Sequence, residues 1–78
     1  MNVIGYRRTS FRPPDGGQEI SGVTLHLTEQ RSGVEGLAVE HVFVSDRKLD
    51  GYFPQLGDDI RLFYNRYGKV DAVELLPQ

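Results

Sequence analysis

Four side chains near the end of the chain have the chemistry of a nucleic-acid contact. Tyr64, Arg66, Tyr67 and Lys69 fall within six consecutive residues. Aromatic rings stack on nucleobases and cations neutralise phosphates, so this combination suits contact with a single strand. The same residues also suit an ordinary hairpin in which Tyr64 belongs to the core and the tip is solvated.

The residues around this group predict a β-hairpin. Ile60, Leu62 and Tyr64 recur at every second position, which is the period of a strand with one buried face. Residues 65–68 fit a short turn with Gly68 in the left-handed conformation, and a strand over 69–75 follows. The apolar spacing in that last strand breaks strict alternation, so we expect a bulge there.

The rest of the chain consists of short β-rich segments between turn signals. We expect strands over residues 2–11, 19–28 and 37–44, because apolar positions alternate and proline and glycine clusters separate the segments. Gly22, inside the second segment, predicts a bulge or a sharp bend. Residues 45–51 predict one helical turn, capped by Ser45 or Asp46 and ended by Gly51.

These elements predict the fold class. About five strands, with a short element between the third and the fourth, favour an all-β fold with the layout of a small five-stranded OB-like barrel. An SH3-like barrel of the same size is the alternative. The 78 residues allow one domain, spanning 1–78.

Composition limits the classes of partner. The chain has no cysteine and no apolar run long enough to cross a membrane, so we expect a soluble cytoplasmic protein without a membrane partner. The net charge of −2 counts against avid, non-specific binding of nucleic acid. The charge is unevenly spread, however, because residues 1–12 contain Arg7, Arg8 and Arg12 and no acid.

Two further groups resemble binding residues. Tyr6 lies beside the N-terminal arginines, although in an ideal strand Tyr6 and Arg8 share one face and Arg7 takes the other. Tyr52 follows the basic pair Arg47 and Lys48 of the predicted helical turn and precedes Phe53. Solvated charge on an edge strand is the structural alternative for the N-terminal group.

Catalytic and metal-binding motifs are missing from the sequence. The serines lie in no nucleophile motif, and no glycine-rich phosphate loop is present. The adjacent Asp58 and Asp59 point to opposite faces of a strand, and His26 and His41 lack the spacing of a metal motif. We therefore expect no enzymatic activity, no metal site and no cofactor.

The chain resembles the small single-stranded-DNA-binding, helix-destabilising proteins of filamentous phages and Gram-positive mobile elements. The resemblance rests on the segments 3–6, 45–49, 56–58 and 64–70. It implies an OB-like barrel, usually a homodimer, that coats single strands with little sequence preference. Residues 29–36 would correspond to the binding wing of that family, where Arg31 stands against Glu29 and Glu35.

The sequence thus leads to two hypotheses. The first is a single-stranded nucleic-acid-binding protein of a phage, plasmid or conjugative element, whose ligand is DNA or RNA. Its predicted contacts are Tyr6, Arg7, Arg8, Arg12, Arg31, Tyr52, Arg66, Tyr67 and Lys69. The second is a small β-barrel that binds a protein partner and no nucleic acid, which the acidic balance favours.

Overall fold

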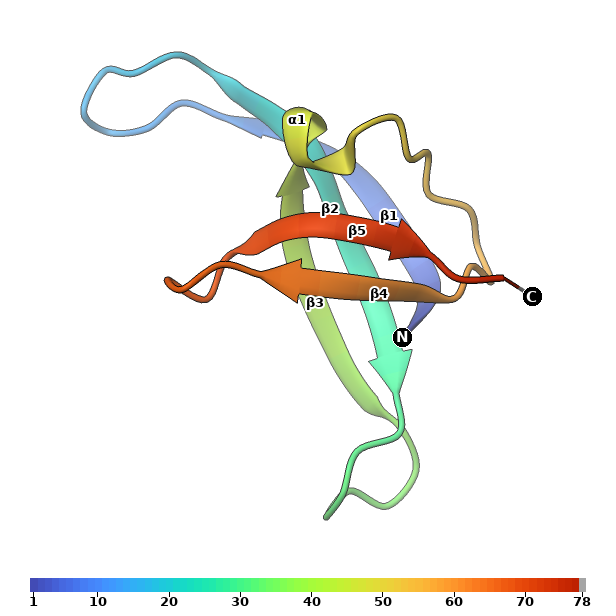
Figure 1. Ribbon diagram of the computed structural model, residues 1–78. Coiled ribbons are helices and arrows are strands. Elements are labelled where there is room, and N and C mark those ends of the chain that lie inside the picture. The colour runs from blue at the N-terminus through green and yellow to red at the C-terminus, as the bar shows by residue number, and fades with distance from the viewer. Residues whose placement is uncertain (78) are drawn as a thin grey trace.

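The computed structural model describes residues 1–77, and antiparallel β-structure dominates it (Figure 1). Strands β1 (Asn2–Phe11), β2 (Ile20–Glu29) and β3 (Ala38–Ser45) form one sheet in that order. Strands β4 (Ile60–Tyr64) and β5 (Val70–Leu75) form a second sheet. A single helical turn, α1 (Asp46–Leu49), follows β3 directly. The predicted all-β class and the predicted helical turn are confirmed.

Alternation in β2 builds the core. Val23, Leu25 and Leu27 are almost completely buried. They form one cluster with buried residues from β1, β3, α1 and β4, namely Val3, Val44, Leu49, Ile60 and Leu62. Burying an aliphatic side chain contributes roughly 1.5–3 kcal/mol, so this cluster is the main force holding the two sheets together.

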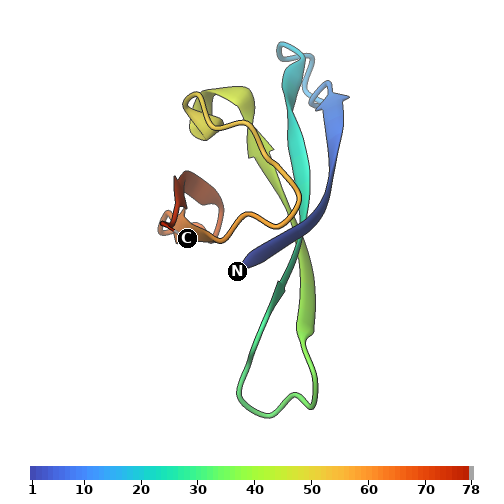
Figure 2. The same cartoon turned by 90° about the vertical axis from the view of Figure 1, so that its right-hand side faces the viewer.

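The β4–β5 hairpin crosses one face of the three-stranded sheet as a second layer, as Figure 2 shows. The layers are joined at the start of β1, where the amide of Val3 donates to the carbonyl of Asp58 and the amide of Gly57 donates to the carbonyl of Val3, both at 2.8 Å. Within residues 1–77, β3 and β5 share no such ladder. The described chain therefore forms two joined sheets and not a closed five-stranded barrel.

Bulges interrupt two of the strands. Val3 pairs with Leu27 and Gly5 pairs with His26, so Ile4 is an extra residue in β1. A second irregularity lies opposite the end of β4, where Asp71 is the extra residue in β5. This second bulge was expected from the broken apolar alternation of that strand.

The predicted bulge at Gly22 is wrong. Gly22 pairs in regular register with both Thr9 and Ser45. Its missing side chain serves close packing instead, because a Cβ atom there would lie 2.2 Å from the carbonyl oxygen of Val44 and 2.8 Å from the ring of Phe43. Glycine is required at this position because a side chain would have no space.

The three-stranded sheet has two distinct faces. We call the face that packs on the β4–β5 hairpin the inner face, and the opposite one the outer face. Val23, Leu25 and Leu27 lie on the inner face, while Thr24 and His26 alternate with them onto the outer face. The pairing register then assigns the residues of β1 and β3 to the same two faces.

Candidate nucleic-acid interface

The tip of the β4–β5 hairpin is organised by one side chain. The carboxamide oxygen of Asn65 accepts hydrogen bonds from the backbone amides of Tyr67 at 2.9 Å and Lys69 at 3.1 Å. The amide of Asn65 also donates to the carbonyl of Lys69 at 2.8 Å, and Gly68 takes the predicted left-handed conformation with φ of 78°. The turn therefore presents its side chains from a fixed backbone.

Two of the predicted contact residues form a unit at this tip. The guanidinium of Arg66 lies 5.1 Å from the centre of the Tyr67 ring, within the range of a cation–π contact. Tyr67 is 73% exposed, so the ring covers no core. A solvent-exposed ring held beside a cation can stack on a base while the cation meets the adjoining phosphate.

A groove lies beside the tip, where the two sheets are not hydrogen-bonded to each other. Its volume is about 440 Å³, within the size range of ligand pockets. Phe11 and Phe43 line it from the three-stranded sheet, and Tyr64, Lys69 and Val70 line it from the hairpin. The groove thus joins aromatic side chains of one sheet to a cation of the other.

The wall on the three-stranded sheet is an aromatic pair that the sequence reading did not identify. The rings of Phe11 and Phe43 meet edge to face with centres 5.4 Å apart. The ring of Phe43 lies against Gly22, which has no side chain to displace it. These two residues are 32 positions apart in sequence (43 − 11), so only the strand register could have revealed the pair.

Burial influences the phenol on the opposite wall. Desolvation raises the pKa of Tyr64, and the nearby carboxylates of Glu40 and Glu29 raise it further, while Arg31 opposes them. Tyr64 is nevertheless 47% exposed, so its ring is accessible. Because its pKa is raised, the hydroxyl is neutral at physiological pH. A neutral phenol beside Lys69 provides an apolar face without adding negative charge.

The N-terminal residues are divided between the two faces, as the strand period predicts. Tyr6 pairs with Leu25 and Arg8 with Val23, so both lie on the inner face. Arg8 there forms a two-pronged ion pair with Asp46 of α1, at 2.9 and 2.8 Å. Arg7 lies on the outer face and Arg12 follows β1, and both are exposed. Neither takes part in an ion pair within residues 1–77.

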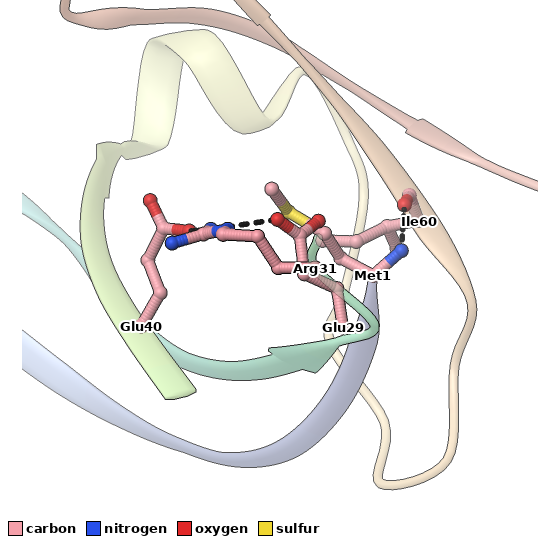
Figure 3. A network of polar contacts seen from close by, with 5 residues as sticks. All are labelled: Met1, Glu29, Arg31, Glu40 and Ile60. Carbon is pink, nitrogen blue, oxygen red and sulfur yellow. Dashed lines mark hydrogen bonds and ion pairs between the residues drawn. The ribbon is translucent and has the colours of Figure 1, made fainter. Parts of the chain in front are cut away.

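Arg31 is held by acids at the base of the loop that follows β2. Its guanidinium lies between Glu29 and Glu40 in Figure 3, with contacts of 2.7 and 3.0 Å. The hydrogen bonds to these two carboxylates raise the pKa of Arg31. The same view shows Met1, whose terminal nitrogen donates to the carbonyl of Ile60 at 3.0 Å. Arg31 therefore fastens the loop to the sheet, and its charge is already balanced.

Tyr52, like Arg31, has structural partners. Its ring packs against the core, and its hydroxyl donates to the carboxylate of Asp58 at 2.7 Å. Burial is the main reason why the pKa of Tyr52 is raised, and the contact with Asp58 adds to it. Of the nine predicted contact residues, three thus have structural partners, namely Arg8, Arg31 and Tyr52. The other six are exposed, namely Tyr6, Arg7, Arg12, Arg66, Tyr67 and Lys69.

The histidines meet although they form no metal cluster. His26 and His41 pair directly across β2 and β3, with ring centres 5.6 Å apart. In the described part of the chain, no group of three or more His, Cys, Asp or Glu residues is placed to hold a metal ion.

Comparison with protein-family models, curated proteins and solved structures found no match to this chain. Within residues 1–77 no helix has the length and apolar character needed to cross a membrane.

Proposed function

We propose that this protein binds single-stranded nucleic acid with little sequence preference, through the hairpin tip and the groove beside it. One observation carries the proposal. The groove brings the Phe11–Phe43 pair against a hairpin whose cations, Arg66 and Lys69, take part in no ion pair among the described residues. Aromatic and cationic groups are thereby combined on one surface of a protein that is acidic overall.

The proposed mechanism combines stacking with charge neutralisation. One base stacks on Tyr67, and a neighbouring base enters the groove against Phe43. Arg66 and Lys69 meet the phosphates on the hairpin side, and Arg7 and Arg12 extend the cationic track along β1. A duplex keeps its bases stacked on one another, so only a single strand can use both aromatic positions.

The architecture supports an OB-like reading of the fold. The strand order β1-β2-β3, the helical turn after β3 and the link between β1 and the start of β4 agree with an OB-like barrel that is open on one side. In OB-folds the second and third strands and the loop between the last two strands contact nucleic acid. The resemblance to mobile-element and phage proteins adds the proposal that two copies act as a homodimer in the cytoplasm.

A fluorescence-anisotropy titration with labelled oligo-dT tests the function. We expect binding at about 50 mM salt that weakens strongly at about 200 mM, with a slope of log affinity against log salt near −3 for four neutralised phosphates. Duplex DNA should bind far more weakly. Absence of binding to single strands at low salt would refute the proposal.

A double variant locates the site. Arg66→Ala with Tyr67→Ala should weaken binding about 10–100-fold, because it removes one stacking ring and one phosphate contact. Arg61→Ala is the matched control, since Arg61 is an exposed arginine on β4 opposite Glu74 and away from the tip. Equal losses in both variants would mean that only net charge matters.

A protein partner is the second candidate function. Phe53 is 79% and Leu56 69% exposed in the connection between α1 and β4, outside the nucleic-acid surface. The two belong to one short segment, and exposed apolar patches are typical of interaction sites. This candidate predicts that oligo-dT is not bound even at low salt, and that freshly purified protein has a low absorbance ratio of 260 to 280 nm. It also predicts a co-purifying protein partner that is lost in Phe53→Ser with Leu56→Ser.

A further inference from the structure

The outer face of the three-stranded sheet carries no carboxylate. Strands β1, β2 and β3 contain only two acidic residues, Glu29 and Glu40, and both lie on the inner face with Arg31. The ionisable side chains of the outer face are Arg7, His26 and His41. An acid-free surface is unusual on a chain with 11 Asp and Glu residues, and it is suited to a polyanion.

The two histidines lie together at the centre of this face. Their rings meet edge to face, with an angle of 68° between the ring planes. Gly5 pairs with His26 and presents no side chain, so β1 does not cover the imidazole. His41 is exposed and His26 is half-buried, which leaves both rings within reach of a ligand on this face.

No carboxylate on this face lies near the two histidines to neutralise a positive charge on them. From β1, Arg7 is the nearest charged side chain on this face. The neighbouring outward positions are Thr24 and Thr28 on β2 and Val39 and Phe43 on β3, none of which is ionisable. Imidazole is the side chain that ordinarily gains its proton between about pH 8 and pH 5. Protonation of the pair would therefore change this face from one cation to three.

We propose that the outer face is a pH-responsive extension of the nucleic-acid surface, on which protonated His26 and His41 contact phosphates of a bound single strand. The inference rests on the proposed function. The Phe11–Phe43 pair belongs to both the groove and the outer face, so a strand that leaves the groove passes onto this face. Two adjacent imidazolium groups repel each other, and phosphate between them removes that repulsion.

Anisotropy titrations with oligo-dT over about pH 5.5–8, at constant ionic strength, test the inference. Thymine does not titrate in this range, so a change in affinity reports on the protein. Affinity should rise about tenfold as pH falls, and the salt slope should become more negative by about 1.4, because two phosphates are added to the contact. His26→Gln with His41→Gln should abolish both changes, so that the affinity of this variant is the same at pH 5.5 and pH 8.

The single variant His41→Gln protects the test against misfolding. Because this side chain is exposed, its replacement should leave the circular dichroism spectrum unchanged and remove about half of the pH effect. Nuclear magnetic resonance provides an independent measurement. Binding and protonation must be reciprocal, so saturating oligo-dT should move the titration of both imidazoles to higher pH.

The outcomes separate this inference from the proposed function. Binding that depends on Arg66 and Tyr67 but is the same at pH 5.5 and pH 8 would overturn the histidine proposal and leave the function standing. A pH effect of equal size in the double histidine variant would also overturn it. No binding at either pH would refute both.

Discussion

The hydroxyl of Tyr52 donates to Asp58 Oδ2 at 2.7 Å, and the same oxygen accepts from the backbone amide of Gln55 at 3.0 Å. One carboxylate oxygen thereby joins the segment after α1 to the turn before β4. That turn also carries the backbone hydrogen bonds to Val3 that connect the two sheets. The Tyr52–Asp58 pair thus stabilises the turn through which the backbone of β1 is hydrogen-bonded to the second layer.

Tyr52→Phe tests this role. It should lower the free energy of unfolding by about 1.5 kcal/mol at neutral pH, because a hydrogen bond to a charged acceptor is lost. The folded state raises the pKa of Tyr52, so this group's contribution is complete below the ordinary tyrosine pKa of about 10 and is lost as pH rises above it. Denaturant titrations should therefore show a steeper alkaline loss of stability in the wild-type protein than in the variant. Parallel alkaline curves would contradict this assignment.

Gly22→Ala should be strongly destabilising. The new Cβ would clash with the carbonyl oxygen of Val44, a backbone atom that cannot move without disturbing the β2–β3 pairing. We expect a loss of about 1–3 kcal/mol or more, the range of overpacked sites. Gly5→Ala is the matched control, because its nearest contact would be an ordinary 3.5 Å from His26. Thermal unfolding of the two variants compares them directly.

Two variants of Asn65 distinguish the effect of the tip's conformation on binding from the effect of its charge. Asn65→Ala removes two hydrogen bonds and should weaken binding to oligo-dT, because the tip loses its fixed conformation. Asn65→Asp keeps the acceptor and should preserve stability, but its negative charge should weaken binding in a salt-dependent manner. Chemical denaturation and anisotropy, measured on both variants, distinguish the two effects. Loss of stability in Asn65→Asp would show that the carboxamide has another role.

Arg31→Gln should affect stability more than binding. The variant leaves Glu29 and Glu40 facing each other without a cation, so the melting temperature should fall at low salt and recover at about 1 M salt. Affinity for oligo-dT should stay within about threefold of the wild-type value, since this charge is already balanced. A loss of affinity as large as that of Arg66→Ala with Tyr67→Ala would show that Arg31 belongs to the binding surface.

The sequence predicted the elements of this fold better than their arrangement. Strand periods, the Gly68 turn and the helical turn after Ser45 depend on neighbouring residues, and all are present. Closure of the sheets depends on contacts between distant segments, which no local pattern records. The partners of Arg8, Arg31 and Tyr52 are likewise set by tertiary structure. Residue type therefore indicated which side chains could contact a ligand, but not which of them are engaged in structural ion pairs and hydrogen bonds.

The extra residue at Ile4 has a consequence for any change in chain length. In uninterrupted register Arg7 would oppose Val23 and face the core, while Tyr6 and Arg8 would turn outward. Phe11 would also turn inward, away from Phe43. Loss of the bulge with Ile4 retained would thus exchange the two surfaces of β1, whereas deletion of Ile4 itself would give regular pairing and leave Gly5 to Phe11 on their present faces. Sequence alignments and engineered variants must therefore preserve the spacing from Gly5 to Phe11 and keep any extra residue before Gly5 in a bulge, if the aromatic pair is to form.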